Sequence, residues 1–326
     1  MSSTKNVLIT GNTINFYMPN RPKLKVKMHT QCFNNFKNNQ KNSMFAIIFD
    51  VLVNKKIIQN SDVIIYIWPN SKLEALFQIN YIISLLSKTQ KIFFLGSNRS
   101  GIKCIQNLLK KWIIITKIDS SNHCILYSGI IVLKPIFLYE NFIKFNKWNN
   151  IVVKTIPGVF SYNNIDHGTK LLMSTCTKNL RWKTVLDIGC GSGVLSTYLA
   201  TIFPEIKLTL IDSNIAALES SKLTLTSNNV CGEIFPSNIY SNVHYQNFDL
   251  IISNPPLHVE NKLNFSIIDN IIKNSVKYLS NKGEIRIVTL KNVPCHKSFT
   301  LYFKKYTILK TSSHYKVYQA NYKDRV

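Results

Sequence analysis

The sequence predicts an α/β protein made of two tandem domains, each built around a mostly parallel sheet with helices on both faces. Three observations lead to this prediction. The chain has 326 residues, about twice the usual length of one domain. Both halves alternate apolar runs of strand length with stretches of helical periodicity. A stretch without clear periodicity, residues 134–150, separates them, so we expect domains at 1–150 and 151–326.

In the first half, residues 62–68 form an apolar, β-branched run that ends before Pro69 and predicts a buried strand. Residues 73–86 follow with apolar side chains at helical spacing, and residues 91–95 form the next apolar run. This order of strand, helix and strand is a βαβ unit. A further helical pattern follows Gly101, so we expect an open α/β sheet in this half.

The second half alternates more clearly. The expected strands are 184–188, 207–212, 248–253 and 284–290, and the expected helices are 194–203, 214–226 and 265–279. This alternation predicts a mostly parallel sheet. A last strand at 315–320 follows with little room for a crossover helix, so we expect it to lie antiparallel.

The charge of the chain indicates a polyphosphate partner. There are 40 basic and 16 acidic residues, a formal net charge of +24. However, only five of the basic residues are Arg, and Asn, Ile and Lys are abundant, a bias that AT-rich coding DNA alone produces. A solvated basic surface is therefore the alternative interpretation.

Membrane, secreted and metal-binding classes are not indicated. The apolar runs are shorter than the roughly 18–20 residues of a membrane span, and residues 1–10 lack the apolar core of a signal peptide. The seven cysteines are scattered singly, without a C-x-x-C pair, which favours reduced thiols and no metal site. We expect a cytoplasmic protein that has no membrane partner.

The strongest local signal is the run VLDIGCGSG at 185–193, a strand that leads into a glycine-rich turn and then a helix. Its glycines allow a tight turn and the close approach of a ligand at the carboxyl end of a strand. The G-x-G-x-G spacing differs from the dinucleotide pattern G-x-G-x-x-G. Asp187 would repel a diphosphate but would attract a cationic sulfonium and amino group. The alternative is a structural turn with an N-capping Asp.

Two further segments support an adenosine cofactor and an amine substrate. Asp212 ends the next strand, where a carboxylate can accept both ribose hydroxyls. The loop Ser253-Asn254-Pro255-Pro256-Leu257-His258 directly follows an apolar strand. Its prolines lack N–H groups, so its carbonyls and the Asn254 side-chain oxygen can accept the hydrogens of a planar amine. A polar turn could also contain this sequence by chance.

The glycine-rich loop at 185–193 and the Asn-Pro-Pro loop at 253–258 resemble those of the class I, S-adenosyl-L-methionine-dependent amino-methyltransferases, which modify nucleobases or a glutamine amide. The segments at 157–161 (PGVFS), 192–196 (SGVLS) and 251–256 (IISNPP) are similar to the family of ribosomal RNA small subunit methyltransferase C, as are IWPN at 67–70 and NRSG at 98–101. The resemblance covers nearly the whole chain.

This resemblance implies two tandem Rossmann-like class I methyltransferase domains. The N-terminal one would be degenerate, without cofactor, and would help to bind RNA. The C-terminal one would methylate the exocyclic N2 amine of one guanine in 16S ribosomal RNA of the small ribosomal subunit, with S-adenosyl-L-methionine as methyl donor. We expect a monomer.

The site residues implied by the resemblance fall into three groups. The cofactor-binding residues would be Asp187, Gly189, Cys190, Gly191, Gly193, Asp212 and Asn238. The catalytic residues would be Asn254 and Pro255, and the substrate-binding residues would be these two with Phe160, Pro256, Leu257 and His258. Phe160 either covers the site or is a buried core aromatic. Leu257 stands where the family usually has an aromatic residue, which weakens base stacking there, and His167 stands where a small apolar residue is commoner.

Catalysis would depend on positioning, because a sulfonium is a good leaving group and a neutral amine needs little acid–base help. Two alternatives stay open. One is a methyltransferase that acts on another RNA base or on a protein glutamine amide. The other is a noncatalytic RNA-binding assembly factor that retains the fold.

Overall fold

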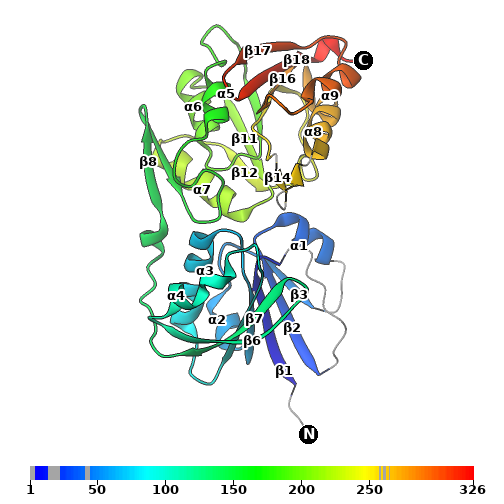
Figure 1. Ribbon diagram of the computed structural model, residues 1–326. Coiled ribbons are helices and arrows are strands. Elements are labelled where there is room, and N and C mark those ends of the chain that lie inside the picture. Colours follow the sequence, from blue (N-terminus) through cyan, green and yellow to red (C-terminus); the bar gives the residue numbers. More distant parts are fainter. Residues whose placement is uncertain (1–3, 14–22, 41–44, 257, 260–261, 264) are drawn as a thin grey trace. The chain divides into compact units, whose positions relative to one another are not determined.

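The computed structural model describes residues 4–13, 23–40, 45–256, 258–259, 262–263 and 265–326. The chain forms two compact units, Met1–Phe142 and Ile143–Val326. Figure 1 shows that each unit contains its own sheet with helices packed around it. We describe each unit by itself.

The first unit holds a seven-stranded sheet in the order β3-β2-β1-β4-β5-β7-β6. The strands are β1 Lys5–Gly11, β2 Leu24–Thr30, β3 Ala46–Phe49, β4 Val63–Ile67, β5 Lys91–Ser97, β6 Ile113–Ser121 and β7 Cys124–Ile131. The helices are α1 Phe33–Gln40, α2 Lys55–Gln59, α3 Lys72–Leu85 and α4 Ile105–Leu109, with 3-10 turns η1 Ile102–Cys104 and η2 Tyr139–Phe142. Strands β1 to β5 pair in parallel, whereas β7 runs antiparallel to β5 and to β6.

The second unit holds a seven-stranded sheet in the order β12-β11-β10-β13-β16-β18-β17. Its strands are β10 Thr184–Ile188, β11 Lys207–Asp212, β12 Glu233–Pro236, β13 Phe248–Ser253, β16 Leu279–Leu290, β17 Thr307–Thr311 and β18 Tyr315–Asn321. Two small hairpins lie outside it, β8 Lys144–Trp148 with β9 Ile151–Thr155 and β14 His258–Val259 with β15 Lys262–Leu263. The helices are α5 His167–Met173, α6 Val194–Ile202, α7 Ile215–Ser227, α8 Phe265–Tyr278 and α9 Cys295–Tyr302, with a 3-10 turn η3 Tyr322–Asp324.

Both units share one strand order. Counted from the first strand of each sheet, the order is 3-2-1-4-5-7-6 in both. The order reverses between the first and fourth strands, which are β10 and β13 in the second unit. In open α/β sheets ligands bind outside the carboxyl ends of the strands at such a reversal. The glycine-rich loop follows β10 and the Asn-Pro-Pro loop follows β13, so the fold brings both motifs to this place.

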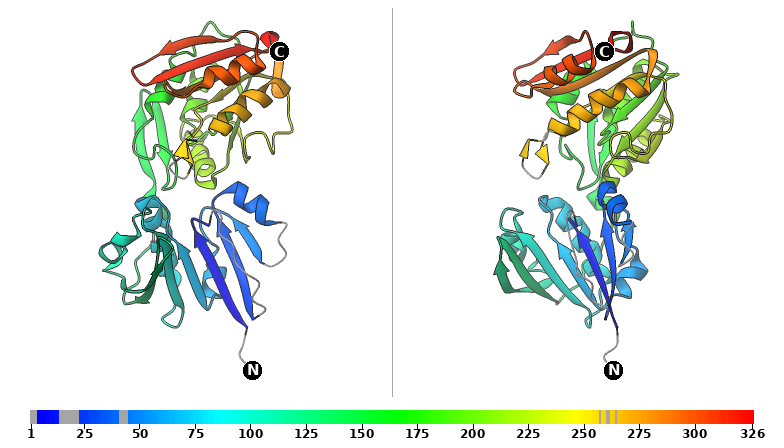
Figure 2. Two further views of the ribbon diagram at one scale, coloured as in Figure 1. Left: turned by 45° about the vertical axis from the view of Figure 1, so that its right-hand side comes forward. Right: turned by 90° about the vertical axis from the view of Figure 1, so that its right-hand side faces the viewer.

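The core of the second unit lies on both faces of its sheet. Alternate residues of each strand face opposite sides of the sheet. Val185, Leu250 and Ile252 pack in one cluster with residues of α5, α6 and α7. Leu186 and Ile251 pack in another cluster with residues of α8 and α9. Figure 2 shows α8 and α9, in orange, beside the sheet.

The expected strands and helices of both halves are present, and the prediction of an antiparallel last strand is confirmed by the pairing of β18 with β16. Strand β16 begins at Leu279 rather than at residue 284. We expected a domain boundary near residue 150, whereas the structure divides after Phe142, because β8 pairs with β9 and packs with the second unit. Among the described residues, no helix is both long and apolar enough to cross a membrane.

Candidate active site

The glycine-rich loop turns sharply after β10 and is held by its neighbouring strand. The backbone N–H groups of Gly189 and Cys190 both donate to the carbonyl of Ile211, at 2.8 and 3.0 Å. Gly189 has φ +73° and Gly191 has φ +55°, values that favour glycine. A Cβ atom at either position would meet no heavy atom within 4 Å. These two glycines therefore leave their backbone open to a ligand.

Gly193 lies in the same loop but packs against helix α7. It caps α6 with φ +73°, and a Cβ atom there would lie 2.9 Å from Cα of Ser221 on α7. Its lack of a side chain allows α6 and α7 to pack closely. The structure thus shows a packing role for Gly193, and its part in cofactor binding stays a prediction.

Asp187 is buried beneath the loop, with 1% of its surface exposed. Its Oδ2 accepts a hydrogen bond of 2.7 Å from the hydroxyl of Ser196 on α6. The pKa of Asp187 is raised to about 7, mainly because the carboxyl is buried; the hydrogen bond from Ser196 lowers this pKa and the negative charge of Asp212 raises it. A cationic group in the adjoining cavity would stabilise the ionised form.

Asp212 supports the loop from the end of β11. Its Oδ2 accepts from the N–H of Gly191 at 3.1 Å, and its Oδ1 accepts from the N–H of Asn214 at 2.9 Å. Burial raises its pKa, against the effect of these backbone donors. Since each carboxylate oxygen has two lone pairs, each can accept one more hydrogen bond. Asp212 can therefore hold the loop and accept ribose hydroxyls at once.

Cys190 and Asn238, both predicted to bind the cofactor, differ in burial. The buried thiol of Cys190 accepts a hydrogen bond of 3.2 Å from the Ser221 hydroxyl, so only its backbone is available to a ligand. Asn238 follows β12 and is exposed, and its backbone N–H donates to Ser241 Oγ at 3.0 Å. Asn238 is not among the residues that line the cavity described below, and its contact with an adenine edge stays a prediction.

The side chain of Asn254 is held in one orientation. Its Nδ2 donates to Oδ2 of Asp166 and to Oγ1 of Thr169, both at 2.9 Å. A carboxylate only accepts hydrogen bonds, so the NH₂ group of the amide must face Asp166. Both amide hydrogens are then used, and the polar atom that remains for a ligand is Oδ1, an acceptor. This agrees with the role that the sequence predicts for Asn254.

Sequence reasoning missed Asp166 and Thr169. Asp166 is the N-cap of α5 and accepts from the N–H of Thr169 at 3.0 Å, while the hydroxyl of Tyr315 lies 3.4 Å from its other oxygen. An Asp directly before a helical apolar pattern, as at Asp166, is a helix N-terminus signal. That signal could have located the cap, but not its contact with a loop far along the chain.

One cavity brings the main predicted residues together. It is lined by Asp187, Gly189, Cys190, Gly191, Asn254 and Phe160, together with Asp166 and Thr169. Phe160 is 70% exposed, so its alternative role as a buried core aromatic is wrong. Gly193, Asp212, Asn238, Pro255 and Pro256 are not among the residues that line this cavity.

The loop after Asn254 is described only in part. Pro255 is buried and Pro256 is exposed. Leu257 lies outside the described residues, and for His258 only the backbone, which begins β14, is described. Among the residues that the structure describes, no group of three or more His, Cys, Asp and Glu side chains could hold a metal ion.

The chemistry of the cavity fits a cationic cofactor that contains adenosine. Among the described residues, its lining includes two carboxylates, Asp166 and Asp187, and no Lys or Arg. A diphosphate would be repelled by such a lining, whereas a sulfonium and an ammonium would be attracted. The two open glycines allow the cofactor to approach the backbone, as the sequence predicts.

Known proteins are similar to both units of the chain. Residues 150–319 match the family described as Methyltransferase small domain, and residues 3–146 match Methyltransferase small domain N-terminal. The chain is 44% identical to ribosomal RNA small subunit methyltransferase C of Buchnera aphidicola subsp. Acyrthosiphon pisum, over 98% of this chain and 95% of that protein. It is 36% identical to the protein of the same name from Serratia proteamaculans, over 90% and 84%.

A solved structure is similar in fold over both units. It is the 16S rRNA N2 G1207 methyltransferase (RsmC) of T. thermophilus in complex with AdoMet and guanosine. The TM-score is 0.83 and the identity is 16%, over 97% of this chain and 88% of that chain. At this identity the likeness shows a shared fold of two tandem domains.

Proposed function

The chain belongs to the family of ribosomal RNA small subunit methyltransferase C, and on that premise we propose that it methylates the exocyclic N2 amine of one guanine in 16S ribosomal RNA. The methyl donor is S-adenosyl-L-methionine. The observation that supports this most directly is the orientation of Asn254, whose side-chain oxygen is left to accept a hydrogen from an amine. The family names supply the RNA target.

The cofactor would be held by the loop between β10 and α6. Asp187 would offset its positive charge, Gly189 and Gly191 would allow it to approach the backbone, and Asp212 would accept its ribose hydroxyls. When bound, it supplies an electrophilic methyl group on a sulfonium. Asn238, exposed after β12, would contact the adenine edge.

The substrate amine would be positioned by Asn254 and Pro255. The Oδ1 atom of Asn254 and the carbonyl of Pro255 would each accept one amine hydrogen and so aim the nitrogen lone pair at the methyl group. Asp166 and Thr169 prevent the Asn254 amide from turning over, which would present donors in place of an acceptor. Such orientation can supply several kcal/mol of rate enhancement, on the order of 7–11 kcal/mol in the best intramolecular systems.

The remaining substrate residues would enclose the base. The exposed ring of Phe160, which lines the cavity, is available to cover an unpaired guanine. Pro256, Leu257 and His258 follow in the sequence and stay predicted substrate-binding residues. The base must leave its stack to reach Asn254, because a paired guanine does not expose its N2 amine to such a pocket.

The first unit would bind RNA without the cofactor. In the second unit Asp187 stands two residues before Gly189 at the end of β10. The corresponding position before Gly11, at the end of β1, is Ile9, which is fully buried, and β2 ends with Thr30 where β11 ends with Asp212. The first unit therefore lacks both carboxylates that suit a cationic adenosine cofactor. We place the protein in the cytoplasm as a monomer.

The direct test uses small ribosomal subunits that lack their own methylation and S-adenosyl-L-methionine with a labelled methyl group. Nuclease digestion and mass spectrometry should locate the label in a single N2-methylguanosine of 16S ribosomal RNA. Label on another base or on a protein glutamine would keep the reaction and change the substrate. Cofactor binding without any transfer to RNA or protein would contradict the proposal.

A further inference from the structure

A second cavity lies beside the active site, on another face of helix α5. Asp166 and Thr169 line the first cavity with Asn254. His167, Lys170 and Ser174 line the second one. These three residues are spaced i, i+3 and i+7, so they share one face of the helix. Helix α5 thus forms a wall of both cavities.

The other wall comes from two loops at the active-site edge of the sheet. Lys291 follows the carboxyl end of β16, and His314 precedes the amino end of β18. The N–H of Lys291 donates to the carbonyl of His314 at 2.8 Å, which holds the two loops together. The hydroxyl of Ser312 accepts from the N–H of Tyr315 at 3.1 Å and fixes the turn between β17 and β18.

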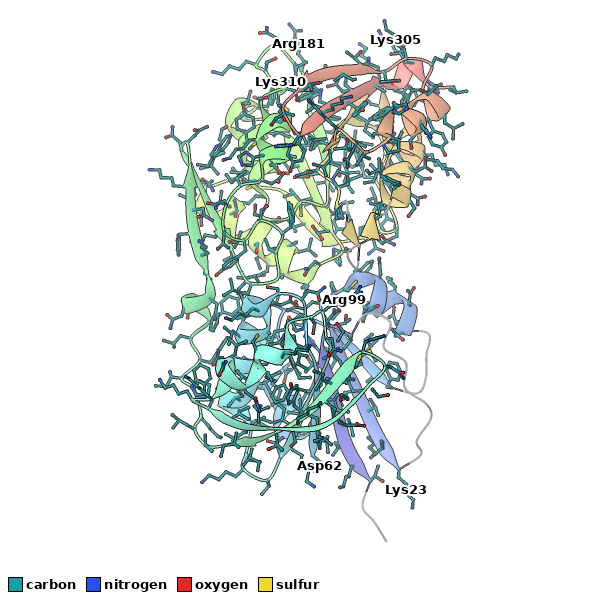
Figure 3. All side chains as sticks on the ribbon, in the orientation of Figure 1. Lys23, Asp62, Arg99, Arg181, Lys305 and Lys310 are labelled. Carbon is teal, nitrogen blue, oxygen red and sulfur yellow. The ribbon has the colours of Figure 1, made fainter. Side chains whose placement is uncertain are left out.

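The second cavity differs from the first in charge. Its lining, as far as the structure describes the chain, includes Lys170, Lys291, His167 and His314, several hydroxyl groups, and no Asp or Glu. A further lysine lies next to it, because Nζ of Lys310 on β17, which is labelled in Figure 3, donates to Ser174 Oγ at 3.0 Å. Amines and hydroxyls without a competing carboxylate are the groups that bind phosphate oxygens.

The two cavities are joined by a short series of contacts. Tyr315, which lines the second cavity, places its hydroxyl 3.4 Å from Oδ1 of Asp166. The other oxygen of Asp166 holds the Asn254 amide. Gly168 allows this arrangement, because a Cβ atom there would lie 2.8 Å from Oδ2 of Asp166 and 3.1 Å from the Tyr315 ring. Helix α5 therefore separates a group bound in the second cavity from Oδ1 of Asn254, the proposed acceptor of the substrate amine.

We propose that this cavity, between α5 and the loops that carry Lys291 and His314, binds a phosphodiester of the RNA strand whose guanine enters the active site. The inference rests on the proposed function, since it assumes an RNA substrate. A base that has left its stack brings its own strand against the protein surface. Phosphate contacts position such a strand while the base contacts select it.

The test compares two double variants of the full chain, and RNA affinity is measured by filter binding over a range of salt concentrations. K170Q/K291Q removes the two lysines of the cavity. K273Q/K277Q removes two exposed lysines of α8 and is the matched control, because it makes the same change in net charge. The probe is unmethylated 16S ribosomal RNA, with inorganic phosphate as a competitor, and cofactor affinity checks that each variant is folded.

K170Q/K291Q should bind the RNA about tenfold more weakly and should reduce the slope of log affinity against log salt by about 1.4, or about 0.7 for each lost phosphate contact. The control should change much less. Equal effects in the two variants, or no change in K170Q/K291Q, would refute the proposal. It would also be refuted if millimolar phosphate abolished the difference in RNA affinity between the wild type and K170Q/K291Q, since the cavity would then be a site for free anions. If the wild type binds RNA in this way but transfers no methyl group, the cavity assignment holds and the proposed function fails.

Discussion

The Nδ2 atom of Asn254 lies 2.9 Å from Oδ2 of Asp166, a residue 88 positions earlier in the chain. Asp166 is also the N-cap of α5, so the same carboxylate begins a helix and orients the amide that we assign to catalysis. This shared use predicts that the two functions of Asp166 can be separated by substitution.

Asp166→Ala should lower kcat by about 10- to 100-fold, because the Asn254 amide loses an acceptor that fixes its orientation and even small misplacement is costly. It should also lower the free energy of unfolding by about 1 kcal/mol through loss of the cap. Asp166→Asn keeps an acceptor oxygen and a capping side chain, so both losses should be smaller. Steady-state kinetics and urea unfolding measure the two effects, and wild-type kcat in the Ala variant would contradict the orienting role.

Asn254→Ala should reduce methyl transfer by at least about 100-fold, since the acceptor for the substrate amine is removed. Cofactor affinity should change little, because the amide points to Asp166 and Thr169 rather than to the glycine-rich loop. Thr169→Val removes only one of the two groups that hold the amide and should cost about tenfold. Single-turnover rates with RNA and calorimetric titration with cofactor separate these effects. A large loss of cofactor affinity in Asn254→Ala would mean that the assignment is wrong.

Cofactor affinity should depend on pH through Asp187. The pKa of this carboxyl is raised to about 7, mainly by burial, so below this pH the carboxyl is protonated and neutral and no longer attracts a cation. Affinity should therefore rise with pH, by up to about tenfold per unit below pH 7, while the cofactor amino group stays protonated. Equilibrium dialysis between about pH 5.5 and 7 measures this slope. The Asp187→Asn variant has no titrating group at this position, so it should bind the cofactor more weakly and with an affinity that does not depend on pH. An equally steep dependence of affinity on pH in this variant would assign the slope to another residue.

Two glycines of one loop should respond differently to alanine. Gly193→Ala adds strain at φ +73° and puts Cβ 2.9 Å from Ser221 Cα, so the free energy of unfolding should fall by about 2–3 kcal/mol. Gly191→Ala is strained too, but its Cβ meets no atom within 4 Å, so it should cost only about 1 kcal/mol. The larger effect of Gly191→Ala should be on cofactor affinity. Chemical denaturation and cofactor titration of both variants test this contrast, which equal stability losses would contradict.

The central strands of the second unit were predictable because each of them is a short, mainly apolar run. The bounds of β10 and β13 follow from such runs, since both faces of these strands are buried. Strand β17 gave no such signal, because all five of its residues are exposed. The turn of the β8–β9 hairpin uses Asn149 at φ +51°, a position that periodicity does not reveal.

The site was predictable only where its residues are neighbours in sequence. The loop from Asp187 to Gly193 and the segment at Asn254 each carry a local pattern of residue types. Asp166, Thr169 and Tyr315 carry none that points to Asn254, because tertiary folding alone brings them to it. The distinction between Gly191 and Gly193 likewise depends on α7, because a Cβ atom at Gly193 would meet Ser221 of that helix whereas one at Gly191 would meet no atom within 4 Å.

The reversed direction of β18 has a consequence for how this kind of enzyme can diversify. Because β18 runs antiparallel to β16, the turn that precedes it lies at the edge where the parallel strands end. A parallel strand in its place would send its preceding loop to the far edge of the sheet. A hairpin turn can lengthen at low entropic cost. Residues 312–314 can therefore change in length or sequence beside the catalytic centre while the cofactor loop stays unchanged.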